Sequence, residues 1–171
     1  EEKVELVPIR DTIRIHDTLF VALDRQKKVY EDSTYRAVVS GITEVLEVIK
    51  GLNCGDESFF EQFLPGENYK EVRQYFANMK FTGNVYAMRE GEIAFPTQPI
   101  ITIEAPIIEG QVLETPLLSI MNHQMAVATK ASRVTRSTTK PVSEFGSRRA
   151  HGPWAAIYGG KAAIIGGCAN S

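Results

Sequence analysis

Apolar residues recur at helical spacing over residues 40–80 of the chain. In SGITEVLEVIKGLN, apolar side chains at positions 42, 45, 46, 49 and 52 follow the i, i+3, i+4, i+7 pattern of an amphipathic helix. A shorter helix is predicted in DESFFEQFLPG, where Asp56 is a capping residue type and Pro65-Gly66 ends the segment. A third is predicted in ENYKEVRQYFANMK, because Val72, Phe76 and Met79 share one face. These faces indicate packing surfaces of a scaffold.

The spacing of apolar residues then changes from helical to alternating. Strand-like runs are predicted around 85–88, 93–95 and 100–103, and the glycine and prolines between them are typical of turns. Residues 1–37 mix short alternating apolar runs with Pro8, which predicts one or two further strands. The first two thirds of the chain therefore read as a β-rich region with flanking helices.

The last third predicts a helix, a strand, a loop, a helix and a strand. Apolar residues at helical spacing predict a helix over 114–133 with Thr115-Pro116 at its start. PVSEF then predicts a short strand, SRRAHG a loop, PWAAIYGGKAA a helix and AIIGG an apolar strand. A strand–helix–strand unit requires a parallel sheet. We therefore expect two regions, a helix-flanked β-rich domain (1–115) and a connecting helix with a first βαβ unit (116–171).

Composition fits a globular protein with a real core. The chain has 171 residues, of which 43% are hydrophobic and 23% charged. It contains no uninterrupted apolar run of the ~18 residues that a membrane span needs, and it starts with an acidic segment, so a cytoplasmic protein is expected. Cys54 and Cys168 lie far apart without metal-ligand spacing, which supports neither a disulfide framework nor a zinc site.

Charge is distributed unevenly along the chain. From residue 121 onward seven Lys and Arg residues stand against the single acid Glu144, although the whole chain has a net charge of -2. A local basic segment in an acidic chain indicates a small anionic ligand, whereas nucleic-acid binders usually carry a broader basic surface. For Lys130, Arg133 and Arg136 the alternative is a solvated helix face.

The predicted loop SRRAHG contains the most informative chemistry. Ligands of parallel α/β proteins bind at the carboxyl ends of the strands, which is where this loop would lie. Phe145 offers a flat face to an aromatic ring, while Arg148 and Arg149 are suited to carboxylate or phosphate oxygens. The alternatives are a core position for Phe145 and surface salt bridges for the two arginines.

These motifs resemble the nicotinate phosphoribosyltransferases. The similarity extends from about residue 38 to 171 and rests on the ordered series FP-x-x-P, LET-x-LL, N-x-Q, ATKA-x-R and FG-x-RRA-x-G. The resemblance implies a β-rich domain followed by the first strands of an α/β (TIM-like) barrel. It also implies transfer of ribose 5-phosphate from phosphoribosyl pyrophosphate to nicotinate, which gives nicotinate mononucleotide for NAD biosynthesis.

The resemblance also implies roles for individual residues. Phe145 would stack on the pyridine ring, Arg148 would face the nicotinate carboxylate or substrate phosphates as the catalytic candidate, and Arg149 would bind phosphate. Gly146 and Ser147 would shape the turn. The full implied substrate-binding set is Phe145, Gly146, Ser147, Arg148, Arg149, Gly166 and Gly167. Relatives commonly couple turnover to ATP through a phosphorylated histidine, and a homodimer with sites at the subunit interface is implied.

The chemistry of the implied reaction agrees with a basic site. Loss of pyrophosphate develops positive charge on the ribose and negative charge on the leaving group, which calls for protein cations and Mg²⁺. The pyridine nitrogen is already a nucleophile, so acid–base catalysis matters less. We therefore interpret His151 as part of the loop structure and His123 as a packing residue of the 114–133 helix.

Some features depart from the pattern of these relatives. IHDTLF replaces an Asp-Leu-Tyr-Gln-like segment whose tyrosine helps to sandwich the ring, and Ala169 stands where many relatives have an acid. The histidine loop and the later barrel strands of relatives have no counterpart in these 171 residues, so we expect a fragment of a longer enzyme. The alternatives are a truncated form that only binds an anionic ligand or another subunit, and a related nicotinamide or quinolinate transferase. The paired arginines favour an acceptor that carries a carboxylate.

Overall fold

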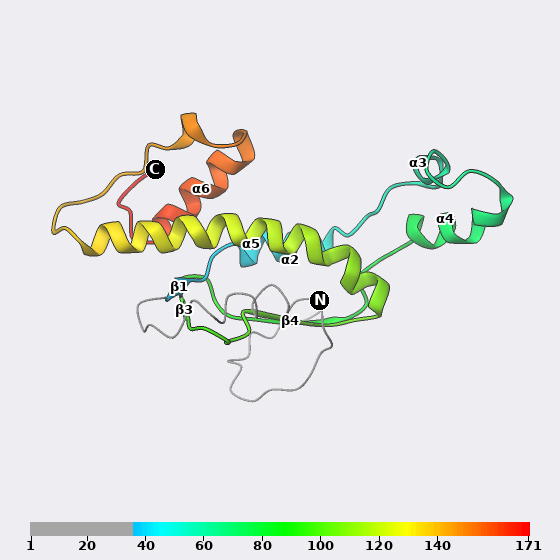
Figure 1. The fold of residues 1–171 in the computed structure, drawn as a ribbon, viewed down its shortest axis with the longest axis horizontal. Coiled ribbons are helices and arrows are strands. Elements are labelled where there is room, and N and C mark those ends of the chain that lie inside the picture. The colour runs from blue at the N-terminus through cyan, green and yellow to red at the C-terminus, as the bar shows by residue number, and fades with distance from the viewer. Residues whose placement is uncertain (1–35) are drawn as a thin grey trace.

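A computed structural model describes residues 36–171 (Figure 1). Its strands are β1 (Ala37–Val38), β2 (Asn84–Ala87), β3 (Ile93–Ala94) and β4 (Ile101–Glu104). Its helices are α2 (Ile42–Lys50), α3 (Glu57–Glu61), α4 (Lys70–Ala77), α5 (Ile107–Arg136) and α6 (Pro153–Ile165), with 3₁₀ turns η1 (Glu67–Tyr69) and η2 (Ser147–Arg149). The strands predicted in residues 1–37 fall almost wholly outside the described residues.

The four strands form two small antiparallel sheets. β1 pairs with β3, and β2 pairs with β4 in a register that places Val85 opposite Ile103 and Ala87 opposite Ile101. The three strand-like runs of the alternating segment are therefore confirmed. Together with the helices they form a mixed helix and sheet structure.

The long helix α5 is the central element of the fold (Figure 1). Leu113 and Leu117 of α5 are 0% and 2% exposed and belong to a core shared with Val45 of α2 and Ile101 of β4. α6 packs on the C-terminal half of α5, where Ala128 and Ala131 meet small residues of α6. α5 thus connects the strand region with the segment that contains the predicted loop. No helix among residues 36–171 is both long and apolar enough to cross a membrane.

α5 begins earlier than the sequence predicts. It starts at Ile107 rather than at Thr115-Pro116, and Pro116 lies inside the helix. A proline inside a helix costs about 3 kcal/mol, but burial of the adjacent Leu113 and Leu117 offsets that cost. Figure 1 shows that α5 bends in its N-terminal part. The boundary expected between residues 115 and 116 lies within this helix, and the division into two domains stays a prediction.

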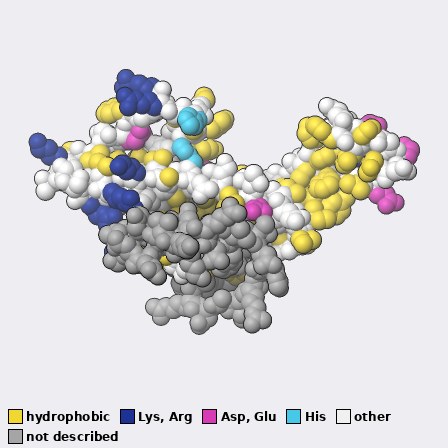
Figure 2. Space-filling model, in the orientation of Figure 1, with side chains coloured by type: hydrophobic (Ala, Val, Ile, Leu, Met, Phe, Trp, Pro, Cys, Tyr) yellow, Lys and Arg dark blue, Asp and Glu magenta, His cyan; other side chains and the backbone are white. Residues whose placement is uncertain are grey.

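The segment α3–η1–α4 projects from the rest of the protein as an arm (Figure 1). Its first helix has the predicted cap, because the Asp56 carboxylate accepts a hydrogen bond from the Phe59 backbone N–H at 2.8 Å. Phe60 of α3 and Phe76 of α4 lie with their ring centroids 5.6 Å apart. Hydrophobic side chains cover much of the visible face of this arm (Figure 2).

The strand predicted at AIIGG is wrong, because these residues end α6. The Gly167 N–H bonds to the Ile164 carbonyl at 2.9 Å, and the Cys168 N–H bonds to the Ala163 carbonyl at 3.0 Å. Gly167 has a φ of 103°, so the segment has the paired bonds and left-handed glycine of a Schellman C-cap. A short apolar run does not by itself distinguish a buried strand from a buried helix end.

A parallel contact does follow α6, a few residues later than predicted. Ser143 and Asn170 form an isolated parallel bridge, and the Ala169 N–H donates to the Val142 carbonyl at 2.8 Å. The strand predicted at PVSEF is wrong, because within that segment only Ser143 forms a bridge, and residues 36–171 contain no complete strand–helix–strand unit. A single bridge does not establish the start of an α/β barrel.

Candidate functional site

The loop of residues 145–152 joins the parallel bridge to the N-terminus of α6. The Glu144 carboxylate organises its start by accepting from the Gly146 N–H and from the Ser171 hydroxyl, the latter at 3.1 Å. The Arg149 N–H then donates to the Gly146 carbonyl at 2.8 Å, which closes the turn of η2. The predicted position of the loop directly before a helix is confirmed, but the loop follows a single parallel bridge and not the predicted strand.

The three side chains predicted to bind substrate lie on this loop and face outward. Phe145 is 75% exposed, so the alternative of a core aromatic is wrong for it. Arg148 and Arg149 are exposed as well. Within residues 36–171 neither arginine forms an ion pair. The loop therefore exposes one aromatic ring and two guanidinium groups on the surface formed by residues 36–171.

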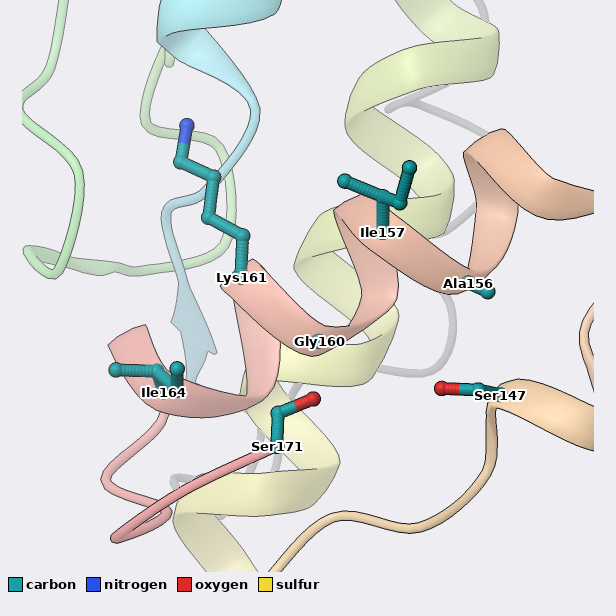
Figure 3. A pocket seen from close by; sticks show the side chains of 7 residues that line it. All are labelled: Ser147, Ala156, Ile157, Gly160, Lys161, Ile164 and Ser171. Carbon is teal, nitrogen blue, oxygen red and sulfur yellow. The ribbon is translucent and has the colours of Figure 1, made fainter.

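A shallow hollow of about 330 Å³ adjoins the loop (Figure 3). Its lining residues are Ser147, Ala156, Ile157, Gly160, Lys161, Ile164 and Ser171. The hydroxyls of Ser147 and Ser171 point toward one another across it, while the Lys161 side chain points away from them, toward α2 (Figure 3). The hollow thus combines an apolar helix face with two hydroxyl groups next to the candidate loop.

Gly166 and Gly167 lie at the opposite end of α6 from the arginines, although the chain returns at Asn170 to pair with Glu144, the neighbour of Phe145. The two glycines follow the C-terminal end of α6, whereas the candidate loop precedes its N-terminal end, and thirteen helical residues span about 20 Å. A Cβ atom at Gly166 would collide with the Ala128 carbonyl of α5. The structure therefore gives both glycines a packing or capping reason, and their substrate role stays a prediction.

A second polar cluster joins α6 to the strand region, and sequence reasoning did not find it. The Lys161 ammonium lies 2.7 Å from Glu44 Oε1 of α2 and 3.2 Å from Glu90 Oε1, which precedes β3. Gln124 of α5 donates from Nε2 to Glu44 Oε2 at 3.0 Å. The partners are up to 117 residues apart in the sequence, so no local spacing could have indicated the cluster.

The ionisation of this cluster is set by its hydrogen bonds. Burial alone would raise the pKa of Glu44, but the bonds from Lys161 and Gln124 outweigh it and lower that pKa below its ordinary value. Burial alone would lower the pKa of Lys161, but its bonds to the two carboxylates raise that pKa. Both directions favour the charged pair at neutral pH.

The remaining titratable candidates have modest roles. His123 Nε2 lies 3.0 Å from the Ala155 carbonyl in the first turn of α6, which agrees with its interpretation as a packing residue between helices. His151 is exposed in the loop. Cys54 and Cys168 are free thiols, and burial raises the pKa of each. The described part of the chain contains no group of three or more His, Cys, Asp or Glu residues able to hold a metal ion.

Comparison with known proteins identifies the family of the chain. The family model for the nicotinate phosphoribosyltransferase (NAPRTase) N-terminal domain matches residues 15–122. Nicotinate phosphoribosyltransferase pncB2 of Mycobacterium tuberculosis is 33% identical over 135 residues, which are 78% of this chain and 29% of that protein. Nicotinate phosphoribosyltransferase of Bacillus subtilis is 49% identical over 83 residues, which are 48% of this chain and 17% of that protein.

Solved structures agree with the sequence matches. Human nicotinic acid phosphoribosyltransferase superposes with a TM-score of 0.65 at 28% identity and covers 78% of this chain, which spans 28% of that structure. Nicotinate-nucleotide pyrophosphorylase from Pyrococcus furiosus gives a TM-score of 0.60 at 26% identity. The superposition covers 87% of this chain and 36% of the Pyrococcus furiosus chain. The chain therefore spans less than a third of the length of the two curated relatives named above, and the family match covers well over half of the chain. The chain belongs to the nicotinate phosphoribosyltransferase family.

Proposed function

We propose that the polypeptide that contains this chain transfers ribose 5-phosphate from phosphoribosyl pyrophosphate to nicotinate, forming nicotinate mononucleotide for NAD biosynthesis. Membership of the family supports this activity, and the sequence similarity to curated nicotinate phosphoribosyltransferases extends over 78% of the chain. The structural observation that carries it is the exposed loop of residues 145–149. That loop places an aromatic ring and two arginines on one short turn before a helix N-terminus.

In this proposal the loop recognises an aromatic acid and an anionic sugar phosphate. The exposed ring of Phe145 stacks on the pyridine, since offset aromatic stacking is favourable beyond its buried area. Arg148 donates to the nicotinate carboxylate or to a substrate phosphate, because a guanidinium matches both groups with two parallel hydrogen bonds. Arg149 assists at phosphate, and the backbone N–H groups at the start of α6 add positive potential.

The same groups suit the charge that develops during transfer. As the bond from ribose C1 to pyrophosphate breaks, negative charge accumulates on the leaving group. A fixed cation therefore stabilises the transition state more than it stabilises the bound substrate. Mg²⁺ would supply further charge on the pyrophosphate, and ATP coupling follows from the family resemblance. We assign Mg²⁺ no ligand among residues 36–171, because they contain no group of three or more His, Cys, Asp or Glu residues that could hold a metal ion.

The acceptor is the least constrained part of the proposal. Two guanidinium groups on the loop favour a pyridine with a carboxylate over nicotinamide. A related transferase that uses nicotinamide or quinolinate as the acceptor is the alternative proposal. A cytoplasmic location and a homodimer are further predictions from the resemblance.

The direct test is product formation by the complete polypeptide that carries these residues. It is incubated with phosphoribosyl pyrophosphate and Mg²⁺ and with nicotinate, nicotinamide or quinolinate, each with and without ATP. We expect nicotinate mononucleotide to form fastest from nicotinate, and ATP to increase the yield. Product only from quinolinate would replace the acceptor. Absence of product with all three, together with binding of phosphoribosyl pyrophosphate, would support the non-catalytic alternative.

Arg148→Ala tests the central residue of the proposal. Because the guanidinium would contact substrate and reach into solvent, kcat/KM for nicotinate should fall about 100-fold, while the melting temperature should change little. Steady-state kinetics and thermal unfolding of the same preparations measure the two effects. Arg133→Ala, which removes an exposed arginine from α5, is the matched control and should leave both unchanged. Equal loss of activity and stability in Arg148→Ala would assign this arginine a structural role.

A further inference from the structure

The cluster around Lys161 is fully connected by hydrogen bonds. Glu90 Oε1 accepts from Lys161 and from the Gly41 N–H, the latter at 2.8 Å, and Glu90 Oε2 accepts from the Thr43 hydroxyl at 3.2 Å. On the other carboxylate, Glu44 Oε1 accepts from Lys161 and Oε2 from Gln124. Every carboxylate oxygen therefore has an N–H or O–H donor. That arrangement suits a structural connection and leaves no oxygen directed at a metal ion.

The cluster is placed where it can control the position of α6. Glu90 lies at the N-terminus of α2, where the helix dipole favours an anion, and it is tied to that helix through Gly41 and Thr43. Glu44 is itself part of α2 and only 8% exposed. Two carboxylates fixed to the same rigid helix end thus bind one ammonium on α6.

Packing alone specifies the position of α6 weakly. The centre of its contact with α5 is made by small residues, with Ala162 near Ala128 and Ala163 near Ala131. One hydrogen bond joins the two helices near each end of α6: His123 Nε2 lies 3.0 Å from the Ala155 carbonyl, and the Thr135 hydroxyl donates to the Gly166 carbonyl at 3.2 Å. Small side chains allow close approach but provide few interlocking projections that resist sliding or rotation of one helix on another. The charge-assisted hydrogen bonds of Lys161 are directional and short, so they add a constraint between the two ends of α6.

Lys161 also borders the candidate site. Its side chain lines the same hollow as Ser147 of the loop, while its ammonium extends toward α2 (Figure 3). The N-terminal turn of α6 follows the loop directly, so a shift of the helix moves the loop with it. The constraint on Lys161 therefore acts on the presentation of Phe145 and the arginines.

We propose that Lys161 is a positioning residue: held between Glu44 and Glu90, it fixes the lengthwise position and rotation of α6 on α5, and with them the loop 145–152. The part of the proposal that concerns substrate rests on the proposed function. The part that concerns α6 does not.

The test compares four variants of the complete polypeptide. Lys161→Met removes the ammonium and keeps an unbranched stem, Lys161→Arg keeps the charge, and Lys130→Met removes an exposed lysine of α5 as a control. Glu90→Gln is a milder disruption that keeps the test usable if Lys161→Met fails to fold. The amide oxygen of the glutamine can still accept a hydrogen bond from the Gly41 N–H. Hydrogen exchange of peptides from 145–165 and the KM and kcat for nicotinate are measured on each.

We expect faster exchange across 145–165 in Lys161→Met and Glu90→Gln, with unchanged exchange in the arm segment 57–77. KM for nicotinate should rise about tenfold, with a smaller change in kcat at saturating substrate, because a displaced loop weakens substrate binding first. Lys161→Arg should restore most of both values. Lys130→Met should match the unmodified protein.

Two results would overturn the proposal. Unchanged exchange over 145–165 in both disrupting variants would show that the cluster does not hold α6. Faster exchange with an unchanged KM would reduce Lys161 to a stabilising residue without a positioning role. If the unmodified protein forms no product with any pyridine acid, the proposed function fails, and the exchange measurement still decides whether Lys161 fixes α6 and the loop.

Discussion

At the scale of single residues, the two glycines after α6 show that one short motif can be interpreted either as the end of a strand or as the end of a helix. Gly167 adopts the left-handed conformation that ends the helix, and Gly166 lets the helix end approach the Ala128 carbonyl. The same Gly-Gly pair in AIIGG resembles the end of a strand when only the sequence is read. The contact with α5 gives the pair a reason that does not involve substrate.

Gly166→Ala should destabilise the protein by about 1–3 kcal/mol, because an added methyl group collides with the backbone of α5 and its carbonyl has no room to move. Gly110→Ala is the matched control within α5, since no atom lies within 4 Å of the added Cβ and alanine favours the helix by about 1 kcal/mol. Chemical unfolding of the two variants should therefore show opposite signs. Equal or higher stability of Gly166→Ala would mean that the helices are not in close contact there.

At the scale of elements, the arm depends on one buried arginine. Arg73 of α4 is 4% exposed and donates from Nη1 to the carbonyls of Leu64 and Gly66, at 2.9 and 2.7 Å. Its Nε also lies 3.8 Å from the carboxylate of Glu57 in α3. The guanidinium therefore holds the α3–α4 connection against the second helix.

Arg73→Met should loosen the arm and leave α5 and α6 intact. Loss of two charged hydrogen bonds to backbone carbonyls costs about 2–4 kcal/mol, and two short helices with exposed aromatic residues have little other packing to compensate for it. Limited proteolysis should then cut within residues 57–77 at least tenfold faster. Lys70→Met, which removes only an exposed surface pair with Glu67, should leave the cleavage rate unchanged. Cleavage first in α5 would contradict an independent role for the arm.

Elements with a clear apolar period were predictable, and elements that depend on tertiary packing were not. The helices around Val45 and Phe76 and the strand at Val85 follow from local spacing. The early start of α5 does not, since the sequence rule for Pro116 is overridden by burial of its neighbours. The loop of the candidate site was found because its chemistry lies in consecutive residues, whereas the Lys161 cluster is assembled from distant segments.

At the scale of the whole protein, α5 separates two regions with different surfaces. Hydrophobic side chains gather on the arm, while lysine and arginine side chains gather at the opposite end, around α6 and the end of α5 (Figure 2). The basic segment that the sequence places after residue 120 is thus also a basic end of the folded protein. A local positive potential there would attract anionic ligands toward the candidate loop.

The Lys161 cluster joins α6 to α2 and to the segment before β3, so its titration should appear in the pH dependence of global stability. The charged groups that face one another are Glu44 of α2, Glu90 before β3 and Lys161 of α6, and α5 contributes the neutral Gln124. The pKa of Glu44 is lowered in the folded protein, so its contribution is complete above the ordinary value of 4.5 and is lost as the pH falls through the lower folded value. The pKa of Lys161 is raised, so its contribution is complete below 10.5 and is lost as the pH rises through the higher folded value.

Glu44→Gln should therefore lower the free energy of unfolding by about 1–3 kcal/mol near neutral pH, and the difference from the unmodified protein should shrink in acid. Chemical unfolding at pH 7 and at a series of values down to pH 3 measures that difference. Glu47→Gln, on the exposed side of the same helix, controls for helix propensity and should show a small difference at every pH. A Glu44→Gln difference that stays constant into acid would mean that the carboxylate stabilises the fold by shape alone, and that α6 is held to α2 without the ion pair.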